Sequence, residues 1–400
     1  MELVLPRLFD FNQIPEHQSF FLFGPRGSGK STLIRSYLEK QPWQLTYDLL
    51  RTQDQLRLLQ KPWLIRSEIE DQLKKSQAGI LQVHIDEVQR IPELLNEAHS
   101  IIETFPKRVR FILSGSSARK LRRAGTNLLA GRAWLKYLDP FTVHELGAEF
   151  KLDLALRFGM LPKAWEGAAS ERQEYLLSYV NTYLREEIQA EAAVRKLDAF
   201  SRFLEAAAKT NGQLVNFSKL ATEASVNRKS VTDYYKILED TLMGFQLPSW
   251  GHRQSRKELV EHGKFYFADC GLVSALNGTL VGGITPAHPY YGFVFEHFIV
   301  VELIKIQHLK PVPDQLGFFR TRAGSEVDLI IESQNKLRAI EIKSLPQLSG
   351  NDLSGLKNFK QEFPQAECTL VYTAHRSALI DGIRCIPWQE FLQNELVSYD

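Results

Sequence analysis

Two clusters of residues in this chain have types and spacings that could do chemistry. The first, GPRGSGKS from Gly24 to Ser31, follows the apolar run FFLF and precedes a helical pattern. Glycines at this spacing let backbone N–H groups and the dipole of the following helix converge on a polyphosphate. Lys30 would neutralise the outer phosphates, and Ser31 would offer its hydroxyl to Mg²⁺. This pattern is a phosphate loop and predicts that the chain binds ATP with Mg²⁺.

We expect the whole loop and the first turn of the helix to surround the nucleotide. The alternative is an ordinary glycine-rich turn before a helix, but an apolar strand pattern directly before the turn favours the phosphate loop. The expected contacts are Gly24, Pro25, Arg26, Gly27, Ser28, Gly29, Lys30, Ser31 and Thr32.

An acidic pair follows a second apolar run. The segment GILQVHI predicts a buried strand from Gly79 to Ile85, and Asp86 and Glu87 come directly after it. An acid at the carboxyl end of a parallel strand can reach a metal at that edge of the sheet. Asp86 would hold Mg²⁺, and Glu87 would act as the general base on the attacking water. Alone, such a pair more often marks a helix N-terminus, but after a phosphate loop it predicts ATP hydrolysis.

Hydroxyl and basic residues follow the next predicted strand, Val109 to Leu113, which ends in SGSS. We expect Ser116 to sense the γ-phosphate, although Ser116 or Ser117 could equally cap a helix. Nine basic residues and no acid lie between positions 107 and 136, which indicates a phosphate-facing surface or an arginine finger for a neighbouring subunit's ATP. They are Lys107, Arg108, Arg110, Arg119, Lys120, Arg122, Arg123, Arg132 and Lys136.

The second cluster lies in the C-terminal third. We expect Glu296 to begin an apolar helix, Asp328 to lie in a strand, and Glu341 and Lys343 to end the next strand. Because strand side chains alternate, Glu341 and Lys343 share a face and would project beside Asp328. The spacing resembles the PD-(D/E)xK nuclease signature, and this resemblance implies that the carboxylates bind a second Mg²⁺ while the lysine orients a water for attack on a phosphodiester. A solvated strand face is the alternative.

The elements between the two clusters are predicted to be helical. The pattern turns helical after Asp139-Pro140, breaks at Gly159-Met-Leu-Pro162, and continues as one long helix from Tyr175 to Val194. Three shorter helices and two strands then follow, with a tight turn at 225–227, and this order predicts a winged helix-turn-helix. Their expected bounds are Phe200 to Ala208, Phe217 to Ala224, Arg228 to Leu242, Phe245 to Trp250 and Lys264 to Phe267.

Basic and hydroxyl side chains cluster on the last of these helices and on the expected wing. They suit contacts to DNA phosphates better than base reading, so DNA is the predicted partner. A packing module between the two clusters is the alternative. The residues concerned are Arg228, Lys229, Ser230, Thr232, Tyr235, Lys236, His252, Arg253, Arg256 and Lys257.

Length and composition limit the classes of protein to which this chain can belong. The chain has 400 residues, enough for several cores, and a formal charge of +2, so attraction to nucleic acid must come from local patches. The three widely spaced cysteines, Cys270, Cys368 and Cys385, predict neither a disulfide framework nor a zinc site. No apolar run is long enough to span a membrane, and the start lacks a signal-peptide pattern. We therefore expect a cytoplasmic protein.

The order of phosphate loop, IDEVQ, SGSS and LAGR resembles that of AAA-type (AAA+) ATPases with a C-terminal domain of unknown function, over essentially the whole chain. The resemblance implies that Arg132 in LAGR is the γ-phosphate arginine, with Arg122 and Arg123 as rivals, or else that all three are solvated charges. It also implies a ring, commonly of six subunits. The Glu341-x-Lys343 spacing resembles the PD-(D/E)xK nuclease signature, although Glu326-Val327 replaces the proline that precedes the acid.

The resulting fold class is α/β. It comprises an AAA+ P-loop ATPase core over 1–140, a helical lid and connector over 141–197, a winged helix-turn-helix module over 198–268, and a restriction-endonuclease-like α/β domain over 269–400. Three functions follow. The first is a ring-forming ATPase that remodels or translocates on DNA, including branched DNA. The others are an ATP-dependent nuclease, and a nucleotide-switched scaffold that binds protein partners.

Overall fold

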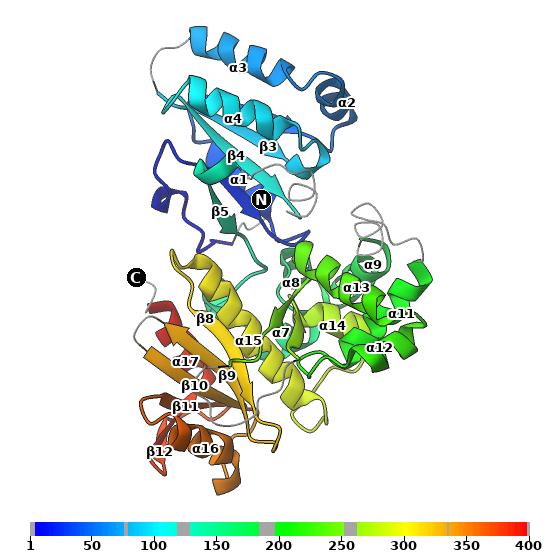
Figure 1. Ribbon diagram of the computed structural model, residues 1–400, viewed down its shortest axis with the longest axis vertical. Coiled ribbons are helices and arrows are strands. Elements are labelled where there is room, and N and C mark those ends of the chain that lie inside the picture. The colour runs from blue at the N-terminus through cyan, green and yellow to red at the C-terminus, as the bar shows by residue number, and fades with distance from the viewer. Residues whose placement is uncertain are drawn as a thin grey trace. The chain divides into compact units, whose positions relative to one another are not determined.

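The protein is described by a computed structural model over residues 5–75, 79–117, 129–183, 197–251, 262–333 and 336–397 (Figure 1). Its chain forms two compact units. The N-terminal unit comprises Met1–Phe141 with Asp240–Leu242, and the C-terminal unit comprises Thr142–Glu239 with Met243–Asp400.

A five-stranded parallel sheet forms the centre of the N-terminal unit, in the order β2-β3-β4-β1-β5. Because all neighbouring strands pair parallel, crossover connections are required between them, and all strands end at one edge of the sheet. The two predicted strands that precede the phosphate loop and the acidic pair are present as β1 and β3. The strands are β1 (Ser19–Phe23), β2 (Gln44–Asp48), β3 (Leu81–Asp86), β4 (Val109–Gly115) and β5 (Ala133–Tyr137).

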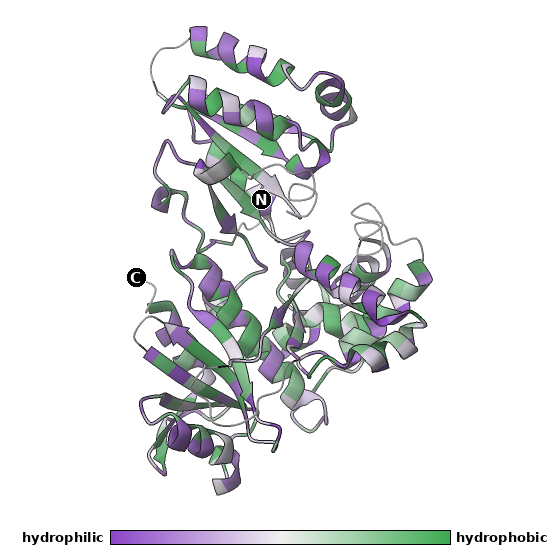
Figure 2. Cartoon of the chain, in the orientation of Figure 1, coloured by the Kyte–Doolittle hydropathy of each residue, from purple (hydrophilic) through white to green (hydrophobic). Residues whose placement is uncertain are grey.

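Helices cover both faces of this sheet. Successive side chains of β1 point to opposite faces of the sheet. Phe20 and Leu22 pack with Ile34 of α1 on one face, whereas Phe21 and Phe23 belong to the core shared with α3 and α4 on the other. Figure 2 shows the strands as largely hydrophobic and the helices as mixed. The elements are η1 (Phe11–Gln13), α1 (Lys30–Leu38), α2 (Thr52–Gln60), α3 (Leu64–Lys75), η2 (Val88–Arg90), α4 (Leu94–Thr104) and η3 (Leu129–Gly131).

The C-terminal unit begins with short helices. Its predicted break at 159–162 is present, because Gly159 has a φ of 68° and Met160 N donates to the buried Asp269 carboxylate. The predicted long helix is interrupted: α9 ends at Ser178 and a π-helical turn, η5 (Tyr179–Tyr183), follows, while 184–196 lie outside the described residues. The elements are α6 (Val143–Leu146), η4 (Gly147–Glu149), α7 (Leu152–Phe158), α8 (Pro162–Glu166) and α9 (Ala169–Ser178).

Three helices and a hairpin follow in the predicted order. Ser225, at a φ of 55°, ends α12 and allows the tight turn into α13. Strands β6 and β7 pair antiparallel, and β7 has the bounds that the sequence predicted. The elements are α11 (Leu197–Lys209), α12 (Phe217–Ala224), α13 (Arg228–Asp240), β6 (Gly244–Leu247), β7 (Lys264–Phe267) and α14 (Cys270–Leu276).

A six-stranded mixed sheet completes the C-terminal unit, in the order β12-β13-β11-β10-β9-β8. β8, β9 and β10 form an antiparallel meander, while β11 pairs parallel with β10 and β13. The strands are β8 (Gln315–Arg320), β9 (Glu326–Ser333), β10 (Lys336–Lys343), β11 (Glu367–Tyr372), β12 (Ala378–Ile380) and β13 (Ile383–Pro387).

The helices of this sheet are α15 (Tyr291–Leu309), η6 (Gly350–Leu353), α16 (Ser354–Glu362) and α17 (Trp388–Val397). α15 begins at Tyr291 rather than at the predicted Glu296, because the YGFVF run continues the apolar pattern toward the N-terminus. Glu296 therefore lies in the second turn of the helix.

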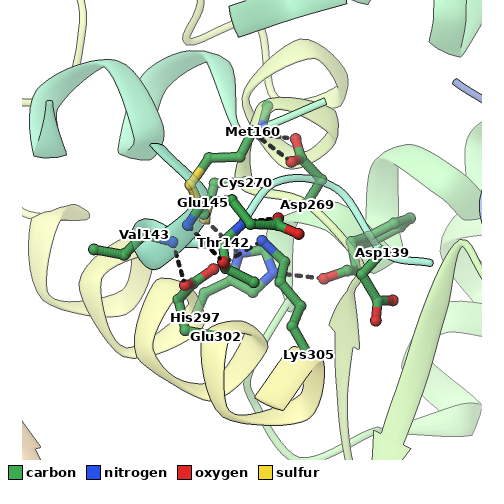
Figure 3. A network of polar contacts seen from close by, with 12 residues as sticks. Asp139, Thr142, Val143, Glu145, Met160, Asp269, Cys270, His297, Glu302 and Lys305 are labelled. Atoms are coloured by element: carbon green, nitrogen blue, oxygen red, sulfur yellow. Dashed lines mark hydrogen bonds and ion pairs between the residues drawn. The ribbon is translucent and has the colours of Figure 1, made fainter. Parts of the chain in front are cut away.

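Buried polar contacts join the start of the C-terminal unit to α15 (Figure 3). Val143 N donates to the fully buried Glu302 carboxylate at 2.8 Å, and Lys305 Nζ pairs with Glu302 at 2.8 Å. Thr142 and Glu145 form a capping box at the N-terminus of α6. Each buried charge thus has a partner, as burial in a low-dielectric core requires.

No helix in the described ranges is long and apolar enough to cross a membrane. Cys270, Cys368 and Cys385 are free thiols, and Cys270 and Cys385 are buried.

Candidate functional site

The phosphate loop links β1 to α1 through a tight backbone turn. Gly27 and Gly29 have φ angles of 79° and 94°, in the left-handed region that favours glycine. A Cβ on Gly24 would lie 2.1 Å from the carbonyl oxygen of Leu138, so only glycine allows this close approach. The loop glycines are therefore required by the geometry of the chain, independently of any ligand.

Lys30 is buried inside this loop. Its Nζ donates to the carbonyl oxygens of Gly24 and Pro25, at 2.8 and 3.1 Å. The nearby Ser28 hydroxyl is buried, and it has no hydrogen-bond partner in the described part of the chain. An ammonium held by carbonyl oxygens and an unsatisfied hydroxyl both fit a loop that receives phosphate oxygens.

The residues expected to hold Mg²⁺ meet at the edge of the sheet. Ser31, in the first turn of α1, donates to Asp86 Oδ2 at 2.8 Å, and Ser114 at the end of β4 donates to Asp86 Oδ1 at 2.5 Å. His84 Nε2 lies 2.9 Å from the Ser114 hydroxyl, and burial lowers the pKa of His84. Two hydroxyls around one carboxylate form an oxygen-rich set, which is what Mg²⁺ prefers.

The expected general base lies beside this set. Glu87 has a φ of 56°, a conformation that residues other than glycine rarely adopt and that is concentrated at functional sites. Its carboxylate accepts from the Gln89 amide and lies 3.5 Å from the Ser116 hydroxyl, and Gln89 Nε2 also donates to Ser116 Oγ at 3.1 Å. The structure therefore brings Glu87 and the predicted sensor Ser116 together.

Two residues of this site were missed from the sequence. Gln89 bridges Glu87 and Ser116, and Ser114 holds Asp86. Both lie within the IDEVQ and SGSS motifs, but their side-chain roles depend on the pairing of β3 with β4. Neither motif reveals that pairing by itself.

Within the basic stretch from Lys107 to Lys136, the structure removes Arg110 from the expected phosphate-facing surface. Arg110 is only 1% exposed, and its guanidinium donates to the Tyr37 hydroxyl at 2.9 Å and to Gln18 O at 3.1 Å. Arg132 pairs with Glu103 of α4 at the surface. Arg119, Lys120, Arg122 and Arg123 lie outside the described residues.

The second cluster assembles largely as its strand pattern predicts. Lys343 Nζ lies 2.6 Å from Glu341 Oε1, and Asp328 Oδ2 accepts from the backbone N–H of Ile342 at 2.9 Å. Glu296 has a partner that the sequence did not indicate: Lys264 of β7 lies 3.2 Å from Glu296 Oε1 and 2.9 Å from Glu326 Oε1. We name Glu296, Glu326, Asp328, Glu341, Lys343 and Lys264 the tail cluster.

Burial dominates the electrostatics of the tail cluster. It raises the pKa of Asp328 well above its usual range, and the charges of Glu341 and Glu296 add to the rise. Burial also raises the pKa of Glu341, while Lys343 opposes the rise. Burial alone would lower the pKa of Lys264, but Glu296, Asp328 and Glu326 outweigh it and the pKa rises. These pKa shifts favour the charged form of Lys264 and the protonated forms of Asp328 and Glu341.

The three carboxylates predicted to bind a metal are not brought together as one ligand set. Within the described ranges, no group of three or more His, Cys, Asp or Glu side chains is arranged to hold a metal ion. Glu341 Oε2 is nevertheless buried without a hydrogen-bond partner in that part of the chain. Glu341 thus keeps one carboxylate oxygen open beside Asp328, whereas Glu296 is bonded to Lys264.

The helix α13 presents part of the expected DNA-binding surface. Arg228, Lys229, Thr232 and Lys236 are exposed. Tyr235 is not available for such contacts, which corrects that expectation, because its ring packs against Phe203 and Phe265 in the core. The wing residues His252, Arg253, Arg256 and Lys257 lie outside the described residues.

Comparison with known protein families divides the chain into three parts. Residues 16–147 match the family described as AAA domain. Residues 149–280 and 291–391 match two families described as Domain of unknown function, DUF8612 and DUF4143. The phosphate loop, the acidic pair and Ser116 all fall within the AAA match.

Two curated relatives match the chain over most of their length. The uncharacterized protein Rv2008c of Mycobacterium tuberculosis is 29% identical over 379 residues, covering 93% of this chain and 80% of the relative. The uncharacterized protein Mb2031c of Mycobacterium bovis gives the same values.

Similar solved structures include the ORC2 protein of Aeropyrum pernix in its ADP form, with a TM-score of 0.33 and 13% identity over 66% of this chain and 89% of that one. Drosophila ORC bound to AT-rich DNA and Cdc6 gives a TM-score of 0.23 and 11% identity over 66% and 85%. Protein VC1899 from Vibrio cholerae gives 0.20 and 12% identity over 95% and 96%. The chain is thus similar to the AAA domain family over residues 16–147, and its later residues are similar to two families of unknown function.

Proposed function

We propose that the N-terminal unit binds and hydrolyses ATP with Mg²⁺. The observation that carries the proposal is the 2.8 Å hydrogen bond between Ser31 and Asp86, directly after a loop that buries Lys30. Lys30 would exchange its two carbonyl partners for phosphate oxygens, and Ser31 with Asp86 would hold the metal. Bound Mg²⁺ supplies charge neutralisation between the phosphates. Glu87 would take the proton of the attacking water while Ser116 and Gln89 hold its carboxylate in place.

We further propose that hydrolysis acts on DNA bound by the C-terminal unit. Exposed Arg228, Lys229 and Lys236 on α13 support this, because lysine and arginine side chains make sequence-independent contacts to phosphates. The helix pair and hairpin then serve as a winged helix-turn-helix. In a homo-oligomeric ring, commonly a hexamer, an arginine of one subunit would complete the ATP site of the next, and Arg132 is our first choice with Arg122 and Arg123 as rivals.

The test measures ATP turnover with Mg²⁺ in the presence of linear, forked, four-way and single-stranded DNA. We expect DNA to stimulate turnover and Lys30→Ala to abolish it without loss of the folded state. If no DNA form binds at low salt or changes the rate, the DNA proposal fails while the ATPase proposal stands. ATP-dependent capture of a protein partner, with turnover unresponsive to DNA, would then select the scaffold function.

A second candidate function, Mg²⁺-dependent DNA cleavage, is favoured by Glu341 Oε2, which lies beside Asp328 and has no hydrogen-bond partner among the residues that the structure describes. In a PD-(D/E)xK-type site these two acids would hold the metal and Lys343 would orient the attacking water. DNA integrity is measured in the same reactions. Full cutting by a Glu341→Ala protein would exclude this site.

A further inference from the structure

The strand β7 faces two different environments. Phe265 and Phe267 point into the core that α11, α12 and α13 share, whereas Lys264 and Tyr266 project from the opposite face. Tyr266 donates its hydroxyl to Glu296 Oε1 at 2.7 Å, and Lys264 Nζ lies 3.2 Å from the same oxygen. We name α11, α12, α13, β6 and β7 the helical module. Its strand β7 thus places two side chains against the tail cluster.

Lys264 is placed as a buried counter-ion. It is 3% exposed, and its ammonium pairs with Glu326 as well as Glu296 and lies 5.5 Å from the centre of the Phe318 ring. A desolvated ammonium among several carboxylates interacts far more strongly than the same pair at a surface. Lys264 therefore provides a fixed positive charge where the sequence pattern predicted a metal ligand set.

The tail cluster consequently has two unlike halves. On one side, Glu296 accepts from Lys264 and Tyr266, and Glu326 pairs with Lys264 and with Arg320 at 2.9 Å. On the other side, Glu341 is 8% exposed and its Oε2 has no hydrogen-bond partner in the described part of the chain. Lys264 and Arg320 pair with the acids of the first half. In the second half Lys343 pairs with Glu341 Oε1, and Glu341 Oε2 stays without a partner in the described ranges.

We propose that the Lys264 ammonium takes the place of a metal ion as the counter-charge of Glu296 and Glu326 in the tail cluster. It holds Glu296 and Glu326, so that a divalent cation binds through Asp328 and Glu341 alone and does so against the charge of Lys264. The inference rests on the proposed cation site of the tail, but it assigns Glu296 to a lysine instead of to the metal. It also makes β7, a strand of the helical module, part of the site that controls cation binding.

The test titrates Mn²⁺ into the nucleotide-free full-length protein and measures affinity and stoichiometry by calorimetry. Glu341→Gln should weaken binding by about tenfold or more, the size expected when a ligand of the metal is removed. Glu296→Gln should leave the affinity within about threefold, because this carboxylate is committed to Lys264. Lys264→Met should tighten binding by roughly tenfold or more, since it frees two carboxylates and removes a competing charge.

Two further variants separate this effect from loss of folding. Lys305→Met breaks another buried lysine–glutamate pair, with Glu302, outside the tail cluster, and should leave Mn²⁺ affinity unchanged. Lys264→Met combined with Glu296→Gln removes both charges of one pair and keeps the protein testable if the single variant unfolds. It should bind Mn²⁺ more tightly than Glu296→Gln alone.

The inference is overturned if Glu296→Gln abolishes Mn²⁺ binding, or if Lys264→Met and the double variant leave the affinity unchanged. It is also overturned if neither the wild type nor these variants bind Mn²⁺ with a dissociation constant below about 1 mM. ATP turnover, measured on the same proteins, depends on the N-terminal unit and reports separately on the proposed function.

Discussion

The Ser31 hydroxyl donates a 2.8 Å hydrogen bond to Asp86 Oδ2, although 55 positions separate the two residues. Ser31 lies in the first turn of α1 and Asp86 is the last residue of β3. A hydroxyl and a carboxylate that are already in contact need little rearrangement to bind the same cation. Folding of the protein therefore already supplies part of the conformational entropy cost of positioning these two side chains.

The first prediction concerns the general base. Glu87→Gln keeps the shape of the side chain but removes the group that takes a proton from water. We expect ATP binding to persist while turnover falls by about 10²- to 10⁴-fold, the usual contribution of general base catalysis. Glu93→Gln, an exposed acid at the start of α4, is the matched control and should turn over at the wild-type rate. Equal rates for Glu87→Gln and the wild type would remove Glu87 from the mechanism.

The second prediction concerns α13. Replacing Arg228 and Lys229 by alanine should weaken DNA binding to a similar extent for all sequences, because phosphate contacts carry no base information. The slope of log K against log salt should become shallower by about 0.9 for each phosphate that the variant no longer neutralises. Lys163→Ala, an exposed lysine on α8, is the control for net charge. Unchanged affinity and slope in the double variant would place the DNA surface elsewhere.

The third prediction concerns pH. Burial raises the pKa of Asp269 to about 6. Between the unfolded value, about 3.9, and this value, the folded state binds more protons than the unfolded state. The contribution of this group is therefore fully present below about pH 4 and is lost as pH rises through 6, a change of about 3 kcal/mol.

Asp269→Asn removes this titration. Denaturant unfolding from pH 4 to 7 should show the wild type losing more stability than the variant across this window. Parallel stability curves for the two proteins would contradict the assignment.

The fourth prediction compares two glycines with nearly the same positive φ angle. Gly159 and Gly278 have φ angles of 68° and 69°, but a Cβ at Gly159 would lie 1.7 Å from Asp269 Oδ1, whereas nothing lies within 4 Å at Gly278. Gly278→Ala should cost only the backbone strain, about 1–2 kcal/mol. Gly159→Ala should cost at least about 2 kcal/mol more, because Asp269 must also move from its hydrogen bond to Met160. Similar melting temperatures for the two variants would contradict this account.

Local patterns in the sequence were sufficient for several elements and for selecting the residues of the candidate nucleotide site. β7 and α12 have their predicted bounds, because period-2 and period-3.6 patterns and turn residues are local signals. Glu341 and Lys343 adjoin as predicted, since alternation along one strand needs no knowledge of the fold. Arg110 and Tyr235 were assigned to surfaces because residue type does not reveal burial, and both pack inside.

By itself, the sequence determined which residues can do chemistry: a lysine and serine after a glycine-rich loop, an acidic pair after a strand, and acids with a lysine in the tail. Only the tertiary structure decided which of them touch. Ser114 reaches Asp86 because β4 pairs with β3, and Lys264 reaches Glu296 because β7 turns one face toward α15. Such contacts depend on strand order and burial, which arise from packing between distant segments and leave no periodic signal along the chain.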